Sequence, residues 1–410
     1  MQKRIHYGWI IALTCFLMVA ISLGLCNSPH GLYQIPITTS TGISRAQFSA
    51  ISTFRFAATA LFNFFFGRLS RKFGLRKLAV FGLASLCAGL TTLSFGSVPA
   101  VFLAGGFLLG IGSALSTTAT SSALISNWFS AHRGLVLGVV LCASGIGGAL
   151  FSRLVSGWIA RLGWRGSYRV SAAIVLLTAV GALLLLRERP SDKGLAPIGR
   201  QSAPETEKPA EKTPSGITLA AALRSPRFYV IMVCSFIVGP LNNPIYVTVP
   251  AQMADKGFSA ESGAAILSWI FISIAVSKVL LGAIHDRIGL IPTLTVCFAS
   301  NLIGLTLLLT GTSLTGYYLF ALIFGLSVPL ENLIHSLVAA RVFGRKDFSS
   351  FVGIAIALCS IGISIGNYLI GLCYDLTGSY RLYIIVSLIL SAAAFAALVL
   401  AVRTAPAQEE

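Results

Sequence analysis

Apolar residues along this chain are grouped in runs of about 20, the length that an α-helix needs to cross the hydrocarbon core of a bilayer. Backbone groups in lipid must find hydrogen-bond partners within their own segment, so these runs predict helices. Twelve runs occur, with approximate limits 8–28, 46–67, 78–96, 101–125, 134–158, 168–186, 227–250, 262–284, 291–311, 316–340, 350–373 and 382–402. The pattern therefore predicts an all-α membrane protein with twelve transmembrane helices.

One long polar stretch interrupts the series. Residues 188–226 are rich in Pro, Glu, Lys, Ser and Gly and show no apolar periodicity. Such composition is typical of a disordered segment. The stretch is predicted to be a cytoplasmic linker between an N-terminal six-helix bundle, 1–187, and a C-terminal six-helix bundle, 227–410.

The two halves also share a sequence repeat at a constant offset of 215 residues. The matching pairs are Asn27 and Asn242, Pro29 and Pro244, Gly67 and Gly282, Gly74 and Gly289, Gly110 and Gly325, Gly138 and Gly353, and Gly147 and Gly362. The repeat predicts two pseudo-symmetric bundles. Transporters built from such repeats bind their substrate near the midplane, between the halves.

The basic residues indicate how the chain is oriented in the membrane. Only 10% of its residues are charged, yet the formal net charge is +17, and soluble proteins carry about 25% charged residues. Most Lys and Arg residues fall in alternate polar segments, and the other set of loops holds only Arg45, Arg161, Arg165, Arg169, Lys256 and Arg381. The positive-inside rule then predicts that both termini are cytoplasmic, in an inner (cytoplasmic) membrane. The first run is long enough to span and lacks a clean cleavage site, so a first helix is favoured over a signal peptide.

Several function classes find no support in the sequence. The P-loop pattern G-x-x-x-x-G-K-[ST] is absent, so energy would come from an ion gradient or from exchange. The eight Cys residues show no C-x-x-C pairing, which argues against a metal site and a disulfide framework. We expect no enzyme activity, no cofactor and no nucleic-acid partner, and a monomer is favoured.

The polar segments that follow the second and eighth predicted helices resemble those of the major facilitator superfamily of transporters. GRLSRKFGLRK, from Gly67 to Lys77, is similar to that family's G-x-L-x-D-R-x-G-x-R-K signature, with Arg71 where the acid is expected. The repeat copy, GAIHDRIG, keeps Asp286 and Arg287. In the family this loop latches the two halves together. The resemblance thus implies gating roles for Gly67, Arg71, Asp286 and Arg287, with a weaker latch in the N-terminal half.

A narrower resemblance is to the monocarboxylate and oxalate/formate transporters. It rests on NWFSAHRGLVLGVVLCASGIGG at 127–148, on Ser44-Arg45-Ala46 and on Tyr374-Asp375-Leu376-Thr377-Gly378. In monocarboxylate transporters an Arg of the eighth helix holds the substrate carboxylate, and an Asp one turn earlier is tied to proton coupling. The resemblance places Lys278 and Ile274 at these two positions. A cation is retained, without the bidentate fork of Arg, but the acid is lost.

Lys278 and Glu331 each lie inside an apolar run. An ionisable residue at that depth needs a cavity or a partner. We expect Lys278 to bind an anionic substrate; the alternatives are that it extends to the membrane interface or pairs with Glu331 for structure alone. Glu331, with His335 four residues later on the same helix face, is expected to replace the missing acid as the proton site. A fixed Glu331–Lys278 pair is the other interpretation.

Further polar residues within the predicted helices complete the candidate substrate site. They are Arg55, Asn27, Asn242, Asn243, Tyr33, Thr117 and Thr120. Arg55 is either a second anion contact or bonded to helix-end carbonyls, whereas Arg153 is expected to reach the membrane interface. Pro29 and Pro244 are predicted to interrupt the first and seventh helices and to act as gates. Packing alone could also explain these prolines, and Thr hydroxyls can bond to carbonyls of their own helix.

These expectations combine into one leading function and two alternatives. The leading prediction is a secondary active transporter that moves a small organic anion, a monocarboxylate, by alternating access, coupled to protons or by anion exchange. One alternative is an exporter of an amphiphilic or cationic compound anchored by Glu331. The other is a receptor on the same fold that transports nothing.

Overall fold

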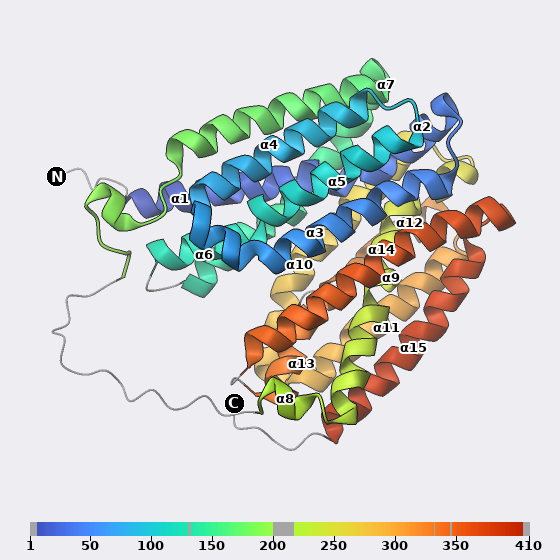
Figure 1. Ribbon diagram of the computed structural model, residues 1–410. Coiled ribbons are helices and arrows are strands. Elements are labelled where there is room, and N and C mark those ends of the chain that lie inside the picture. Colours follow the sequence, from blue (N-terminus) through green and yellow to red (C-terminus); the bar gives the residue numbers. More distant parts are fainter. Residues whose placement is uncertain (1–5, 130–132, 200–216, 332, 345–346, 405–410) are drawn as a thin grey trace.

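The computed structural model describes residues 6–129, 133–199, 217–331, 333–344 and 347–404. Within these ranges the chain is helical apart from short connections, and no strand occurs beyond a single bridge between Phe129 and Ile198. The helices form two bundles that lie side by side (Figure 1). The predicted all-α class is confirmed.

The helices follow the order of the predicted apolar runs. In the first half they are α1 (Tyr7–Val19), α2 (Gln34–Thr41), α3 (Arg45–Phe73), α4 (Leu75–Ser94), α5 (Pro99–Ser116), α6 (Thr118–Trp128) and α7 (Arg133–Leu185). The second half holds the short α8 (Leu219–Ala222), then α9 (Pro226–Asp255), α10 (Ala260–Ile288), α11 (Leu290–Thr310), α12 (Leu314–Gly325), α13 (Leu333–Phe343), α14 (Phe348–Thr377) and α15 (Arg381–Arg403). Among the described residues, 11 segments are long and apolar enough to span a membrane. One of them, α7, reverses direction at Gly163 (φ 70°, ψ 170°) and contains two predicted runs, so the twelve crossings are present.

Three crossings are broken in the middle. The first passes from α1 through a π-helical turn, η1 (Ala20–Leu25), and a 3-10 turn, η2 (Ser28–Tyr33), into α2. The fourth breaks at Thr117, whose backbone (φ −114°, ψ −124°) separates α5 from α6. The tenth contains a 3-10 turn, η4 (Val328–Glu331), between α12 and α13. Breaks of this kind are tolerated at membrane depth where the backbone is covered by protein or lines a cavity.

The predicted break in the seventh crossing is wrong. The α9 helix continues from Pro226 to Asp255 despite three internal prolines. Pro244 cannot donate a hydrogen bond to the carbonyl of Pro240, but the hydroxyl of Tyr383 donates to that carbonyl at 2.9 Å. A neighbouring side chain therefore satisfies the backbone group that the proline leaves free.

The described parts of 188–226 contain a 3-10 turn, η3 (Pro190–Lys193), and the short α8. The carbonyl of Arg187 accepts from Trp128 Nε1 at 2.9 Å, and the backbone N–H of Ile198 donates to the carbonyl of Trp128, also at 2.9 Å. At the far end, the backbone N–H of Leu219 donates to Asp347 at 2.7 Å. Each end of the linker is thus fastened to its own bundle, and residues 200–216 lie outside the described part.

The two bundles touch at the end of the molecule that carries α2 and diverge toward the end that carries α6 and α13 (Figure 1). We call these the closed end and the open end. At the closed end Gly31 of η2 lies against α9, where a Cβ atom would come 1.8 Å from the carbonyl oxygen of Val247. Toward the open end, Gly67 and Gly353 have free space where a Cβ would lie.

A cluster of polar contacts, which we call the clasp, fastens the closed end. The guanidinium of Arg45, at the start of α3, forms an ion pair with Asp255 at 2.5 Å and donates to the hydroxyl of Tyr380 at 2.7 Å. It also lies 3.6 Å from the ring centroid of Tyr374. The carboxylate of Asp375 accepts from the first backbone N–H groups of α3, at 3.1 and 2.9 Å. An acidic group at a helix N-terminus is stabilised by the unpaired N–H groups and the helix dipole.

The clasp joins residues from both halves, so removing its cation should shift the molecule toward a form that is open at this end. In Arg45→Gln, loss of hydrogen bonds made by a charged group should cost about 1–3 kcal/mol of closure. Spin labels at Thr39 and Leu376, in a background without native cysteines, should report a longer inter-label distance population. Arg161→Gln, at an exposed arginine of α7, is the matched control. An Arg45→Gln distance distribution identical to that of the control would show that the clasp does not hold this end closed.

Candidate functional site

Three charged side chains within the membrane-spanning segments are buried or half-buried. Arg55 of α3 is 2% exposed, Glu331 at the end of η4 is 9% exposed, and Lys278 of α10 is half-buried. No two of them form an ion pair with each other; Arg45–Asp255 is the one ion pair between described side chains. We call these three residues the charge cluster.

Arg55 is held by the broken first crossing. Its Nη2 atom donates to the carbonyl of Cys26, between η1 and η2, at 2.8 Å. This carbonyl is available because the change of helix type leaves it outside the regular bonding pattern. The other guanidinium N–H groups have no partner among the described residues. The alternative that Arg55 bonds to a helix-break carbonyl is therefore seen, and donors remain for a second partner.

Tyr246 of α9 lies within electrostatic reach of both Arg55 and Glu331. Its hydroxyl accepts a hydrogen bond of 2.6 Å from Asn243 Nδ2, and Asn243 Oδ1 accepts from Asn367 of α14 at 3.0 Å. These bonds fix the orientation of the phenol, and its own O–H remains available as a donor. From the sequence, Tyr246 was expected to line an outer vestibule together with Tyr33, and a contact with substrate was not predicted for it.

Lys278 reaches across to the other half. Its Nζ donates to Ser144 Oγ of α7 at 3.2 Å. It does not extend to a membrane interface, as one alternative proposed, and it lies near enough to Glu331 for an electrostatic interaction without forming an ion pair. Two glycines allow this close approach, since Cβ atoms at Gly145 and Gly148 would each meet α10 at 2.7 Å.

Glu331 owes its position to the break in the tenth crossing. The η4 turn, which includes Pro329, ends at Glu331 and is itself buried. The Oε1 atom of Glu331 is buried and has no hydrogen-bond partner among the described residues. The side chain of His335, its predicted partner in proton coupling, lies outside the described part. The geometry leaves one carboxylate oxygen of Glu331 unpartnered.

Several other predicted substrate residues are engaged in bonds within the protein. Asn242 Oδ1 accepts from Asn301 of α11 and from Ser327, at 3.0 and 2.8 Å, and the Asn242 side chain is fully buried. Thr117 and Thr120 donate to the carbonyls of Ser113 and Leu115. These contacts support the broken fourth and tenth crossings.

Tyr33 and Asn27, two residues of the first crossing that were predicted to bind substrate, differ in whether their polar groups already form hydrogen bonds. The hydroxyl of Tyr33 bonds to Ser167 at 2.8 Å, and its ring stacks on Tyr168 with 4.0 Å between centroids. Asn27 is half-buried at the start of η2, and its side chain makes no hydrogen bond to another described residue. Asn27 therefore keeps its amide available beside Cys26 and Arg55, whereas Tyr33 does not.

The predicted gating residues fall into two groups. Gly67 and Arg71 lie at the end of α3, and Arg287 lies in the last turn of α10; both arginines are exposed. The side chain of Asp286 lies outside the described part. Pro29 begins the η2 turn, whereas Pro244 is an interior residue of the unbroken α9. No contact between the clasp residues was predicted. Most of them belong to Ser44-Arg45-Ala46 and to 374–378, the segments on which the resemblance to monocarboxylate transporters rests.

The chemistry available at the charge cluster is anion binding and proton exchange. Two cations and one carboxylate carry a formal charge of +1 between them. No group of three or more His, Cys, Asp or Glu side chains suitable for a metal ion occurs among the described residues. The remaining N–H groups of Arg55 are hydrogen-bond donors without a partner among the described residues.

Comparison with known proteins agrees with this architecture. A bacterial homologue of the human lysosomal transporter Spinster, in an inward-facing and unoccupied conformation, superimposes with a TM-score of 0.73 at 15% sequence identity, covering 97% of each chain. This likeness concerns the fold.

Sequence relatives are more specific. Monocarboxylate transporter 13 of Bos taurus is 26% identical over 386 residues, which is 93% of this chain and 86% of that protein. The agnestins efflux protein AgnL12 of Paecilomyces divaricatus is 24% identical over 369 residues, 87% of this chain and 79% of that protein. The family model of the Major Facilitator Superfamily matches residues 8–339 and 231–410. This chain is therefore a multi-pass membrane transporter that belongs to the Major Facilitator Superfamily and resembles its monocarboxylate transporters.

Proposed function

We propose that the protein is a secondary active transporter that carries a small organic anion, a monocarboxylate, across the cytoplasmic membrane by alternating access. The observation that carries this proposal is a buried cation, Arg55, and a half-buried cation, Lys278, neither of which is bonded to a carboxylate of the described residues. Taking a charge out of water costs several kcal/mol even after the protein relaxes. An anion that enters between the two cations offsets that cost, so binding favours negatively charged substrates.

The charge balance of the cluster favours a single negative charge on the substrate. Arg55, Lys278 and Glu331 sum to +1, which one carboxylate neutralises. The carboxylate would accept from the free guanidinium N–H groups of Arg55 and from the Tyr246 hydroxyl, while the Lys278 ammonium interacts with it as a point charge. Asn27 supplies a further amide on the side of η2. The mammalian relative named a monocarboxylate transporter agrees with this substrate class.

Proton symport follows from the same charge balance. With Glu331 ionised and no substrate, the cluster carries +1. With Glu331 protonated and one carboxylate bound, it again carries +1, so the loaded and empty forms cross the membrane field with equal charge. Glu331, with His335 beside it in sequence, is the proposed proton site. Anion exchange would instead keep Glu331 ionised and require an anion in both directions.

The proposed orientation places both termini in the cytoplasm, in accordance with the distribution of basic residues. The clasp then lies on the outer side and the open end faces the cytoplasm, so this structure is the inward-facing form. Gly67, Arg71, Asp286 and Arg287 lie in sequence at the inner ends of α3 and α10, where a latch would form when the inner side closes. Pro29 and Gly31 lie on the outer side, where the first crossing contacts α9.

Replacing either cation should weaken anion binding. Arg55→Gln and Lys278→Gln should each weaken monocarboxylate binding by roughly 10- to 150-fold, because a hydrogen bond to a charged group is worth about 1.5–3 kcal/mol. Binding is measured by ligand-induced thermal stabilisation of the purified protein, and transport by uptake into proteoliposomes. Arg153→Gln removes an exposed arginine of α7 and serves as the control that keeps both. Undiminished binding in both cluster variants would exclude the proposed site.

Glu331→Gln should separate binding from coupling. The neutral amide cannot exchange a proton, so accumulation driven by an imposed pH gradient should fall to the level seen without a gradient. Binding and counterflow exchange should persist, since both cations remain. His335→Gln distinguishes a shared proton site from one that uses Glu331 alone. Gradient-driven uptake with an unchanged pH profile in Glu331→Gln would refute this role.

A second candidate function is export of an amphiphilic or cationic compound. It is favoured by the unpartnered Glu331 Oε1 and by the fungal efflux relative. In that case Glu331→Ala, and not Lys278→Ala, would remove binding of an organic cation. For the anion carrier, Lys278→Ala, and not Glu331→Ala, would remove binding of the anion.

A further inference from the structure

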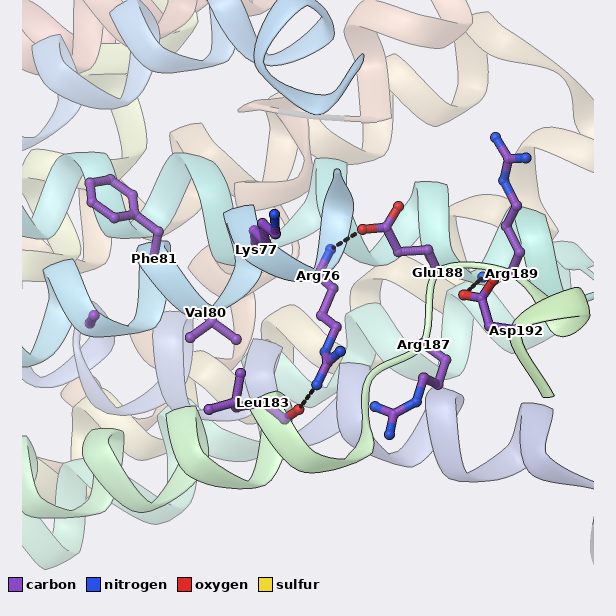
Figure 2. Close-up of a pocket in the computed structure, with 10 residues that line it drawn as sticks. Arg76, Lys77, Val80, Phe81, Leu183, Arg187, Glu188, Arg189 and Asp192 are labelled. Atoms are coloured by element: carbon purple, nitrogen blue, oxygen red, sulfur yellow. Dashed lines mark hydrogen bonds between the residues drawn. The ribbon is translucent and has the colours of Figure 1, made fainter. Parts of the chain in front are cut away.

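A cavity lies on the outside of the N-terminal bundle, and none of the charge-cluster residues lines it (Figure 2). It has a volume of about 890 Å³ and is bounded by α4, by the last turns of α7 and by the first residues of the linker (Figure 2). Four cationic side chains line it: Arg76, Lys77, Arg187 and Arg189. The transport cycle proposed above gives these residues no role.

Two carboxylates, Glu188 and Asp192, also line the cavity, so four positive charges face two negative ones. Glu188 accepts from the backbone N–H of Arg76 at 3.1 Å, at the start of α4. Gly74 makes room for this carboxylate: its φ is 80°, and a Cβ there would come 2.3 Å from Glu188 Oε1. Asp192 accepts from the backbone N–H of Arg189 at 3.1 Å. Neither acid forms an ion pair with a described side chain.

Two of the guanidinium groups are held in place by the end of α7. Arg76 Nη2 donates to the carbonyl of Leu183, and Arg187 Nη1 donates to the carbonyls of Leu184 and Leu186 at 3.0 and 2.8 Å. The Nε atom of Arg76 is buried and has no partner among the described residues. A fixed guanidinium with unused N–H groups suits a phosphate, which offers several acceptor oxygens.

The rest of the cavity wall is apolar. Val80 and Phe81 of α4 and Leu183 of α7 line it, with Phe81 57% and Leu183 47% exposed. Both helices belong to membrane-spanning segments, so this wall continues onto a surface that hydrocarbon chains cover. The cavity therefore combines a basic region beyond the helix ends with an apolar region along the helices.

We propose that this cavity binds an anionic phospholipid, with its phosphate among the four cations and an acyl chain against Phe81 and Leu183. Basic pockets between membrane helices on the cytoplasmic side suit acidic headgroups. Free inorganic phosphate has the same headgroup chemistry but gains nothing from the apolar wall, so the wall favours the lipid. Glu188 joins the linker to α4 through the backbone N–H of Arg76 and to α6 through its own carbonyl, which accepts from Asn127 Nδ2 at 3.0 Å. A lipid bound in the cavity would stabilise this joint.

The test compares three additions to the full-length protein in neutral detergent: phosphatidylglycerol, phosphatidylcholine and inorganic phosphate. Native mass spectrometry counts bound lipid, and thermal unfolding reports stabilisation. Phosphatidylglycerol should remain bound and raise the unfolding midpoint, and the other two should not. Lys77→Gln, alone and combined with Arg187→Gln, should reduce phosphatidylglycerol binding at least tenfold. Arg224→Gln, an exposed arginine next to α8, should leave it unchanged.

Three outcomes would overturn the proposal. Equal binding of phosphatidylcholine and phosphatidylglycerol would mean that the cations do not select the lipid. Full stabilisation by inorganic phosphate would identify a soluble anion as the ligand. Unchanged phosphatidylglycerol binding in the folded Lys77→Gln protein and in the double variant would place the lipid elsewhere. Anion transport by these variants is measured in a separate assay. Failure of the proposed transport function is thereby distinguished from failure of the proposed lipid site.

Discussion

Charge that is buried at membrane depth without a counterion is the constraint on which the rest of this structure depends. A guanidinium or an ammonium in hydrocarbon needs a partner or a cavity, so Arg55 and Lys278 have to lie where the two bundles meet. The broken first crossing gives Arg55 the carbonyl of Cys26, and Ser144 of the opposite half gives Lys278 one hydrogen bond. These contacts satisfy each cation only in part, which leaves a site that is complementary to an anion.

The helix breaks and the contacts between halves serve this arrangement. The η4 turn places Glu331 in the interface, and hydrogen bonds from Asn301 and Ser327 to Asn242 brace the same region. At the closed end the polar contacts between the halves come from Arg45 with its acid and aromatic neighbours and from the N-terminus of α3, and Gly31 packs against α9. One apolar cluster is continuous across the two halves, from Phe48 of α3 to Ile270 of α10 and Ile384 of α15, and a second lies within the C-terminal half. Alternating access therefore requires part of this shared apolar surface to separate when the clasp opens.

The sequence alone predicted the twelve-helix fold and identified the charged residues that lie within apolar runs. Helix length and hydropathy predicted the twelve crossings, because lipid allows few alternatives, and Arg55, Lys278 and Glu331 stood out as charges in apolar runs. Contacts between distant elements could not be predicted in the same way. Arg45 and Asp375 are 330 positions apart in the chain, and nothing local to either indicates that they meet.

The directions of neighbouring side chains on a helix explain why the different contacts of Asn242 and Asn243 could not be predicted from the sequence. Asn242 and Asn243 were predicted together, yet adjacent positions on a helix point about 100° apart. One side chain faces α11 and the η4 turn, and the other faces Tyr246 and α14. The bend expected at Pro244 also failed for a reason outside the local sequence, since the bond that rescues the Pro240 carbonyl comes from Tyr383 of α15.

The position of a bound anion tests the central claim most directly. Crystals of the protein grown with a bromine-labelled short monocarboxylate would locate the ligand by the anomalous scattering of bromine. The account predicts one strong peak between the two halves, with the carboxylate within hydrogen-bonding distance of the Arg55 guanidinium and near Tyr246 and Lys278. An anomalous peak elsewhere, with Arg55 still bonded to the carbonyl of Cys26 alone and Lys278 to Ser144 alone, would contradict it.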